Sequence, residues 1–208
     1  MKAICAGGSS AAFFWDPDVW EKLKRETIPH LIINKKEGSV LRIWVGNCST
    51  GQWAYTVLIV FLEVIEELRP DAGIKLQVLA SDIDGERVEF AKKGLYLNNI
   101  AVTSLVSGVN KVRLKRFFNK EGNRYRVKDE IREMVEFSVR DLVDDEPLTE
   151  IDFLFCKWLL QYFDLEVKLK FISRFMESLV PGGVLFLDDK VYYRHYYIRL
   201  PSLEGKSK

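Results

Sequence analysis

Apolar residues recur along this chain in two alternating patterns that together predict an α/β domain. Short, continuously apolar runs are typical of buried strands, and stretches with apolar residues every three or four positions are typical of helices. The predicted strands are residues 39–45, 74–81, 151–156, 184–187 and, at the sheet edge, 191–200. The predicted helices are residues 16–31, 52–68, 85–93, 102–118 and 165–179. This alternation predicts a doubly wound, mostly parallel sheet with helices on both faces.

Capping residues and prolines mark where these helices begin and end. Asp16 is a suitable N-cap for the first helix, and Pro17 suits its first helical position. Pro70 stops the second helix, and Asp84 is a suitable N-cap for the third. The run Pro-Gly-Gly at 181–183 ends the last helix, so we expect the following strand to begin at residue 184.

The loop at 46–51 follows an apolar strand and leads directly into a long helix. Its sequence, Gly-Asn-Cys-Ser-Thr-Gly, lets a ligand approach bare backbone amides at the helix N-terminus. The next strand ends in Asp82, and an acid in that place can accept both hydroxyls of a ribose. Acids at strand ends also cap helices, but Asp84 is the better cap here. The sequence therefore predicts a ligand crevice at the carboxyl ends of the first two strands.

The composition is that of an ordinary globular domain. The 208 residues suit one domain, 1–208, and a net charge of +1 gives no support to nucleic-acid binding. Three widely spaced cysteines suit free thiols in a reducing compartment, and two histidines give no basis for a metal site. No apolar run approaches the length of a membrane span, so we expect no membrane insertion.

Several short motifs, in order and at matching spacing over about residues 9–190, resemble the chemotaxis receptor methyltransferases. These motifs are Phe13-Phe14-x-Asp16, Arg42-Ile43-Trp44, Cys48-Ser49-Thr50-Gly51, Ser81-Asp82-Ile83-Asp84, Tyr125-Arg126-Val127, Val135-Glu136-Phe137, Phe155-Cys156, Tyr162-Phe163-Asp164 and Pro181-Gly182-Gly183. The resemblance implies a class I methyltransferase fold in a cytoplasmic enzyme that transfers a methyl group from S-adenosylmethionine (SAM) to glutamate side chains of chemoreceptors. S-adenosylhomocysteine (SAH) is then the product. Members of the family usually begin with a small helical domain, which we expect to be missing here.

The resemblance also implies the positions of the site residues. The implied cofactor-binding residues are Ala11, Trp15, Gly46, Ser49, Thr50, Gly51, Trp53, Asp82, Asp141, Leu142 and Cys156. Tyr162 is placed beside the reacting methyl group, where its hydroxyl can orient the incoming oxygen, although a buried Tyr162 with a purely structural role is the alternative. Lys157 supplies a positive charge where the family has arginine, without the bidentate geometry. A carboxylate acceptor is already ionised near neutral pH, so no strong general base is required.

Three tryptophans replace polar or charged family residues at positions expected to converge on one crevice. Trp15 replaces an arginine, Trp53 a glutamate of the cofactor pocket, and Trp158 an asparagine, while Asp141 stands where asparagine is usual. One interpretation is that the tryptophans fill the pocket, leaving a catalytically silent relative that acts through protein contacts. The other is that the indoles form an aromatic wall around a cation such as the sulfonium of SAM. The sequence also leaves open a different methyl acceptor.

A basic stretch suggests a protein partner. The residues are Lys111, Arg113, Lys115, Arg116, Lys120, Arg124, Arg126 and Lys128. Residues 125–139 are predicted as strand, helical turn and strand. In the family this region forms a small inserted β-subdomain, here about 110–138, on which some members dock the C-terminal tail of a chemoreceptor. A chemoreceptor cytoplasmic region or its tail is therefore the implied partner, and a solvated helix face with a surface hairpin is the alternative.

Overall fold

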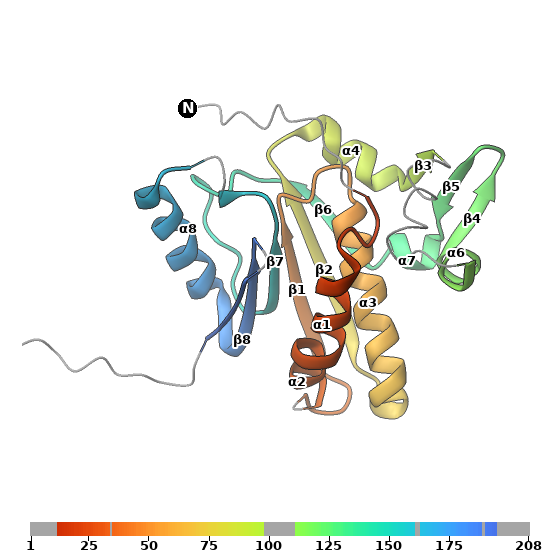
Figure 1. The fold of residues 1–208 in the computed structure, drawn as a ribbon, viewed down its shortest axis with the longest axis horizontal. Coiled ribbons are helices and arrows are strands. Elements are labelled where there is room, and N and C mark those ends of the chain that lie inside the picture. Colours follow the sequence, from red (N-terminus) through yellow and green to blue (C-terminus); the bar gives the residue numbers. More distant parts are fainter. Residues whose placement is uncertain (1–11, 34, 98–110, 161–162, 189, 195–208) are drawn as a thin grey trace, which may run out of the picture.

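Six strands form the central sheet in the computed structural model, which describes residues 12–33, 35–97, 111–160, 163–188 and 190–194. The strand order is β6-β2-β1-β7-β8-β9. The strands are β1 (Val40–Gly46), β2 (Lys75–Asp82), β6 (Val135–Val139), β7 (Ile151–Cys156), β8 (Leu179–Leu187) and β9 (Lys190–Tyr193). Neighbouring strands run parallel except β8 and β9, which are antiparallel (Figure 1). The predicted mostly parallel sheet is confirmed.

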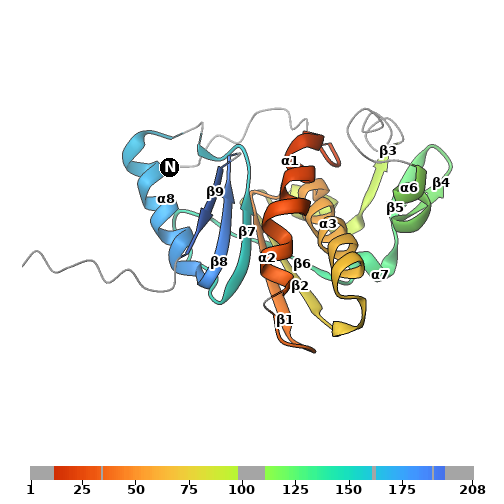
Figure 2. The same cartoon turned by 60° about the horizontal axis from the view of Figure 1, so that its bottom comes forward.

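Helices cover both faces of this sheet, as the doubly wound prediction requires (Figure 2). One face carries α1 (Pro17–Lys22), the π-helical turn η1 (Leu23–Thr27), α2 (Ile28–Ile33), α3 (Gln52–Leu68) and α4 (Gly85–Lys93). The other face carries α8 (Leu165–Ser178). A short 3-10 turn, η2 (Pro70–Ala72), follows α3.

The two faces are built from alternate residues of each strand, because successive side chains of a strand point to opposite sides. Ile43 and Val45 of β1 belong to the core under α3. Trp44, between them, belongs to the core under α8, where its ring packs edge-on against Phe175 with centroids 5.8 Å apart. Burial of both faces explains why β1 is continuously apolar apart from Arg42.

A second, three-stranded antiparallel sheet lies beyond the β6 edge (Figure 1). It comprises β3 (Leu95–Leu97), β5 (Arg124–Val127) and β4 (Phe118–Glu121), with α6 (Lys111–Phe117) and α7 (Asp129–Arg132) beside it. Its strand β3 comes from outside the range 110–138, and residues 135–138 of that range belong to the central sheet. An inserted subdomain with those bounds stays a proposal.

Several helix boundaries follow the sequence prediction. The helix α3 spans the predicted residues 52–68. At the start of α4, one oxygen of Asp84 accepts hydrogen bonds from the backbone N–H groups of Glu86 and Arg87, and Gly94 closes the helix with φ of 58°. The predictions for residues 102–110 and 195–200 lie outside the described residues.

Two boundary predictions were wrong, for identifiable reasons. Asp16 makes no capping hydrogen bond; its backbone has φ of 62°, and its carboxylate lies toward Lys157 instead. The run 181–183 lies inside β8 rather than before it. A Cβ at Gly183 would lie 2.9 Å from the carbonyl oxygen of Val180, so glycine lets β8 continue where its pairing register with β7 shifts.

Candidate functional site

The carboxylate of Asp82 joins the two loops at the carboxyl ends of β1 and β2. Its Oδ2 accepts the backbone N–H of Ser49 at 2.7 Å, and its Oδ1 accepts the backbone N–H of Asp84 at 3.0 Å. Asp82 is only 1% exposed. Each carboxylate oxygen can accept more than one hydrogen bond, so these two contacts leave acceptor capacity. The loop expected to contact a cofactor is therefore fixed by the acid expected to contact the ribose.

Backbone strain is concentrated around this edge of the sheet. In the described part of the chain, seven non-glycine residues have positive φ, and all but Glu150 lie at or against this edge. The six are Phe14, Asp16, Asn47, Ser49, Trp158 and Asp188. Such conformations cost about 1–3 kcal/mol each and are commonly found at functional sites. The strain and the predicted crevice therefore coincide.

Ser49 supplies an independent sign that this edge binds a polar ligand. Its hydroxyl oxygen is buried and has no hydrogen-bond partner, and the residue stands just before α3, whose first turn carries backbone N–H groups without helical partners. A buried hydroxyl of this kind fits a group that brings its own hydrogen-bonding atoms. SAM, with a carboxylate and a ribose, is such a group. The residues present therefore fit the cofactor that the sequence resemblance implies.

Three of the predicted cofactor-binding residues meet at one point. A Cβ added to Gly46 would lie 3.4 Å from Cδ1 of Leu142 and 3.6 Å from Sγ of Cys156. Gly46 pairs with Cys156 across β1 and β7, so sheet register brings these two together. Leu142 reaches them from the segment after β6. The structure therefore places Gly46, Leu142 and Cys156 on one wall.

Glycine is required at Gly51, at the start of α3. Its φ is 92°, and a Cβ there would lie 2.8 Å from Cβ of Ala91 and 3.0 Å from the hydroxyl of Tyr96. That hydroxyl donates a 2.8 Å hydrogen bond to the carbonyl oxygen of Thr50. Thr50 and Gly51 are thus held by α4 and β3. Sequence reasoning missed Tyr96, because nothing in the sequence pairs it with this loop.

The three tryptophans converge as predicted. Trp158 packs edge-on against Trp15 at 6.3 Å and against Trp53 at 5.4 Å between ring centroids. Trp53 is 3% exposed and also packs against Trp20 and Phe155, whereas Trp15 is 43% exposed. The row of indoles therefore runs from the core under α1 and α3 out to the surface.

The ammonium group of Lys157 lies among these indoles. Its Nζ is 5.7 Å from the ring centroid of Trp53 and 5.9 Å from that of Trp158, within the range of cation–π attraction. The Lys157 side chain is 3% exposed, and Oδ2 of Asp16 lies 3.9 Å from Nζ. The indoles thus lie beside a cation that belongs to the protein itself, and both interpretations of the tryptophans, a filled pocket or an aromatic wall, stay predictions.

Asp188 is a further buried acid close to Lys157 along the sheet edge. It follows β8, its backbone N–H donates to the carbonyl oxygen of Cys156, and its Oδ2 accepts the N–H of Leu160 at 2.8 Å. Its Oδ1 is buried without a partner. Sequence analysis did not single out Asp188, because nothing in the sequence pairs it with the segment after β7.

The remaining predicted site residues differ in outcome. Asp141 uses its Oδ1 to accept the backbone N–H groups of Val143 and Asp144, so its carboxylate caps a local turn. Tyr162 and Ala11 lie outside the described residues, and their assigned roles stay predictions.

Cys48 is buried next to Asp82. Burial and the negative charge of Asp82 raise the pKa of its thiol well above the usual value, which suits a structural residue rather than a nucleophile. Cys48 and Cys156 are both buried. Among the residues that the structure describes, no group of three or more His, Cys, Asp or Glu side chains could hold a metal ion.

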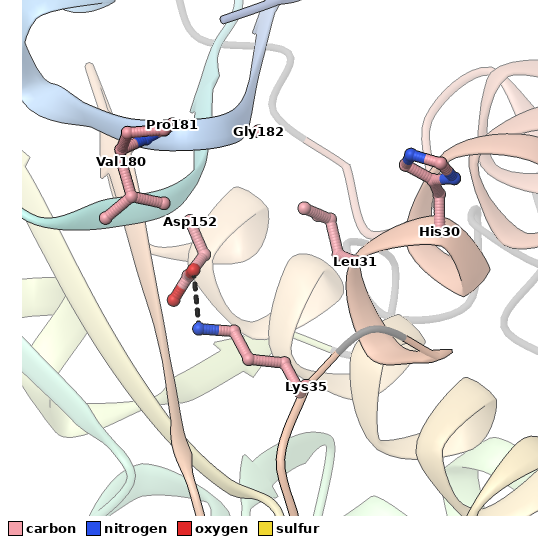
Figure 3. A pocket seen from close by; sticks show the side chains of 7 residues that line it. All are labelled: His30, Leu31, Lys35, Asp152, Val180, Pro181 and Gly182. Carbon is pink, nitrogen blue, oxygen red and sulfur yellow. Dashed lines mark ion pairs between the residues drawn. The ribbon is translucent and has the colours of Figure 1, made fainter. Parts of the chain in front are cut away.

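A separate hollow of about 270 Å³ lies at the opposite, amino-terminal edge of the sheet (Figure 3). His30 and Leu31 of α2 line one side of it, and residues 180–182 of β8 line another. Inside it, Nζ of Lys35 lies 2.6 Å from Oδ1 of Asp152, whose Oδ2 accepts the backbone N–H of Arg42. Each oxygen of this buried acid therefore has a partner, and the ion pair ties the end of α2 to the central strands.

A parallel sheet with a glycine-containing loop after β1 and an acid at the end of β2 defines an α/β domain that binds a nucleoside-type cofactor. The comparisons with known proteins agree and are more specific. The chain belongs to the family described as CheR methyltransferase, SAM binding domain, whose model matches residues 9–190.

Curated relatives support this membership. "Chemotaxis protein methyltransferase 1" of Pseudomonas aeruginosa is 34% identical over 177 residues, covering 84% of this chain and 63% of the relative. "Chemotaxis protein methyltransferase Cher2" of Pseudomonas putida is 34% identical, with 84% and 62% covered. An "Uncharacterized 104.1 kDa protein" of Rhodobacter capsulatus is 32% identical over 85% of this chain, but only 18% of that protein is matched. The chain thus spans less than two thirds of each of these relatives.

One solved structure with a similar arrangement is "PKMT2 from Rickettsia typhi in complex with AdoHcy". It is 18% identical, with a TM-score of 0.44 over 85% of this chain and 25% of that chain. A likeness at this level carries no argument about function. In the described ranges of the chain, no helix combines the length and apolar character needed to cross a membrane.

Proposed function

We propose that this chain is a SAM-dependent methyltransferase domain that transfers a methyl group to a carboxylate side chain of a chemoreceptor. The observation that carries the proposal is the Asp82 carboxylate, which links the loop after β1 to the end of β2 beside the unpartnered hydroxyl of Ser49. This arrangement occurs in a chain that belongs to a SAM-binding methyltransferase family.

The roles of the protein residues follow from their positions. Asp82 offers its remaining acceptor capacity to ribose hydroxyls, and Ser49 with the first turn of α3 receives a carboxylate. The wall formed by Gly46, Leu142 and Cys156 excludes water from one side. Bound SAM would supply a methyl group on a sulfonium, which a carboxylate oxygen can accept directly. The role proposed for Lys157 is to attract that carboxylate toward the methyl group.

The first test is a calorimetric titration of SAM and SAH into the protein, read beside tryptophan fluorescence. Because Trp53 lies at the start of α3, cofactor binding is expected to change indole emission. Ser49→Ala should weaken SAH binding by about tenfold, because the variant loses one hydrogen bond to the carboxylate of the ligand. Ser173→Ala on the outer face of α8 is the control. Absence of binding at millimolar SAM and SAH would refute the cofactor assignment and favour a relative that acts through protein contacts.

The acceptor class is tested separately with radiolabelled SAM. Methyl esters of carboxylates release methanol in mild base, whereas methyl groups on nitrogen do not. Base-labile label on a chemoreceptor cytoplasmic fragment, lost when its acceptor glutamates are changed to glutamine, is the expected result. Base-stable label would point to another acceptor, and binding of SAM without transfer would point to a silent module.

We also propose that the small sheet recognises the receptor, through its tail or another cytoplasmic region. Both β3 and β4 are edge strands, so either can accept an added strand. Three of the eight basic residues are already paired with glutamates of the chain: Arg113 with Glu63, Arg116 with Glu66 and Arg126 with Glu121. Lys111, Lys115, Lys120 and Arg124 are exposed.

Anisotropy of a labelled acidic tail peptide would test this contact. Lys120→Glu on β4 should abolish binding, and Lys168→Glu on α8 should not. Equal binding by both variants would favour a solvated surface with no docking role. A cytoplasmic location belongs to the same proposal, because a receptor's cytoplasmic region is the expected partner.

A further inference from the structure

We infer that a second ligand site lies between α8 and the turn at residues 141–145, and that it takes a small carboxylate with an apolar body. The site is a hollow of about 390 Å³. Hollows of roughly 300–1,000 Å³ that combine apolar walls with a few convergent polar groups are typical of small-molecule sites. The methyl transfer proposed above does not use this hollow, so the inference goes beyond that function.

The hollow is lined by one residue of the turn and by one side of α8. Its lining residues are Val143, Val167, Lys170, Phe171, Ser173 and Arg174. The residues from α8 recur every three or four positions, so they share one side of the helix. Phe171 is 2% exposed and belongs to the core under α8, whereas Val143 is 41% exposed. The hollow therefore has an apolar floor supported by the core, and its wall at Val143 is open to solvent.

Arg174 gives this hollow a positive charge that is only partly satisfied. Among the described residues, its guanidinium donates one hydrogen bond, from Nη2 to the backbone carbonyl oxygen of Asp145, and its Nε is buried without a partner. A guanidinium has five N–H donors, so donors remain for a ligand. A partly buried charge without an opposite charge is costly, and a carboxylate is the group that fits a guanidinium best. Arg174 is therefore the expected anchor for an anion.

Lys170 adds a second positive charge at the exposed rim. Its ammonium lies 3.3 Å from Oε1 of Glu166, but the two side chains are 70% and 82% exposed, so this ion pair is weak. Asp141 and Asp145 each use a carboxylate oxygen to accept backbone N–H groups within the turn. In the described part of the chain, no acid lines the hollow. The charges of the lining therefore select an anion, and its floor selects an apolar body.

Adjacent residues of the turn belong to two different sites. Leu142 lies on the wall with Gly46 and Cys156, whereas Val143 lines the hollow. Asp141 fixes the turn between them by accepting the backbone N–H of Val143 at 2.8 Å. A ligand in the hollow thus contacts the segment that carries the cofactor wall without occupying the wall. We therefore expect this ligand and the cofactor not to compete.

The test is a calorimetric titration of the full chain with octanoate, and octan-1-ol is the neutral match. We expect octanoate to bind at least about tenfold more tightly, because the ion pair with Arg174 adds to the same apolar contacts. Val143→Glu places a carboxylate at the open wall and should abolish octanoate binding. Its matched control is Val112→Glu, which changes a 71% exposed valine of α6 in the same way and should leave binding unaltered.

A second pair of variants tests the anchor. Arg174→Gln should weaken octanoate binding about tenfold, because it removes the charge that pairs with the carboxylate. Lys168→Gln, on α8 but outside the lining, should not weaken it. Melting temperatures show whether each variant is folded. Val143 is an exposed position, so Val143→Glu decides the question even if Arg174→Gln fails to fold.

Absence of octanoate binding at about 10 mM, a weak affinity for a ligand of this size, would overturn the inference. So would equal affinity for octan-1-ol, full binding by Val143→Glu, or an equal loss in Val112→Glu. Displacement of octanoate by SAH would place it at the cofactor edge and would overturn the inference as well. The octanoate series itself is measured without SAH, so the cofactor assignment can fail while this site is still tested.

Discussion

The backbone N–H of Ser49 lies 2.7 Å from Oδ2 of Asp82, and this hydrogen bond joins the loop after β1 to the end of β2. The other carboxylate oxygen of Asp82 accepts the backbone N–H of Asp84, and Asp84 is the residue that caps α4. One buried side chain therefore positions the start of two helices. The residue that we propose to bind the cofactor ribose thus also organises the backbone at this edge of the sheet.

Replacing this carboxylate is expected to lower both stability and cofactor affinity. Asp82→Asn keeps one acceptor oxygen but turns an amide NH2 toward a backbone N–H, which costs about 1–3 kcal/mol for a buried polar group left unpaired. Urea unfolding measures the loss of stability, and calorimetry should show SAH binding weakened at least about tenfold. Asp71→Asn, at an exposed position in η2, is the control. Unchanged unfolding and binding in Asp82→Asn would contradict the assigned role.

Gly51 and Gly38 both have positive φ, so alanine substitutions at the two positions test how tightly loop 46–51 packs against α4. Alanine at Gly51 suffers both left-handed backbone strain and a contact of 2.8 Å with Ala91. Alanine at Gly38, with φ of 71°, meets nothing within 4 Å. We expect Gly38→Ala to cost about 1 kcal/mol from strain and Gly51→Ala about 1–3 kcal/mol more from overpacking. Equal melting temperatures for the two variants would show that the loop can move away from α4.

Glu63 should make stability depend on pH. Burial raises the pKa of its carboxyl, but hydrogen bonds and charges from Arg113 and Lys24 outweigh burial, so its pKa lies below the usual 4.5. A lowered pKa in the folded state stabilises the protein above the unfolded-state pKa, and this contribution is lost as the pH falls through the lower folded-state value. Glu63→Gln should therefore be about 1–3 kcal/mol less stable near pH 7.

The same comparison at about pH 3 provides the check on Glu63, because the gap between Glu63→Gln and the unaltered chain should narrow there. Urea midpoints at the two pH values measure it. Glu67→Gln, an exposed residue of the same helix, is the control. A gap that stays constant with pH would mean that packing rather than charge accounts for the loss.

Tyr96 links the small sheet to loop 46–51 through its hydrogen bond to the carbonyl oxygen of Thr50. Tyr96→Phe removes that bond, with an expected cost of about 0.5–1.5 kcal/mol in unfolding free energy. SAH binding should weaken as well, since the loop loses a restraint. Tyr193→Phe, at a 40% exposed position on β9, should change neither quantity. A Tyr96→Phe protein with unaltered SAH affinity would show that β3 does not support the site.

Local patterns in the sequence determined the elements and the edge at which the site lies. The apolar spacing of 52–68 and the cap at Asp84 specify two helices through contacts within a few residues of each other. Continuous apolar runs specify buried parallel strands, and Asp82 and loop 46–51 must then share one edge of the sheet. Such features depend only on residues that are close together in the sequence, so they could be predicted. The order and spacing of the short motifs over residues 9–190 also indicated the family.

Only the tertiary structure decided which partner each polar group takes. Asp16 has the sequence of an N-cap, yet it lies beside Lys157, which is 141 positions later in the chain. Gly183, predicted to end a helix, continues β8. These outcomes depend on the register of β7 and β8 and on long-range contacts between buried charges and aromatic rings. Local sequence does not encode such contacts, because they exist only once the sheet has formed.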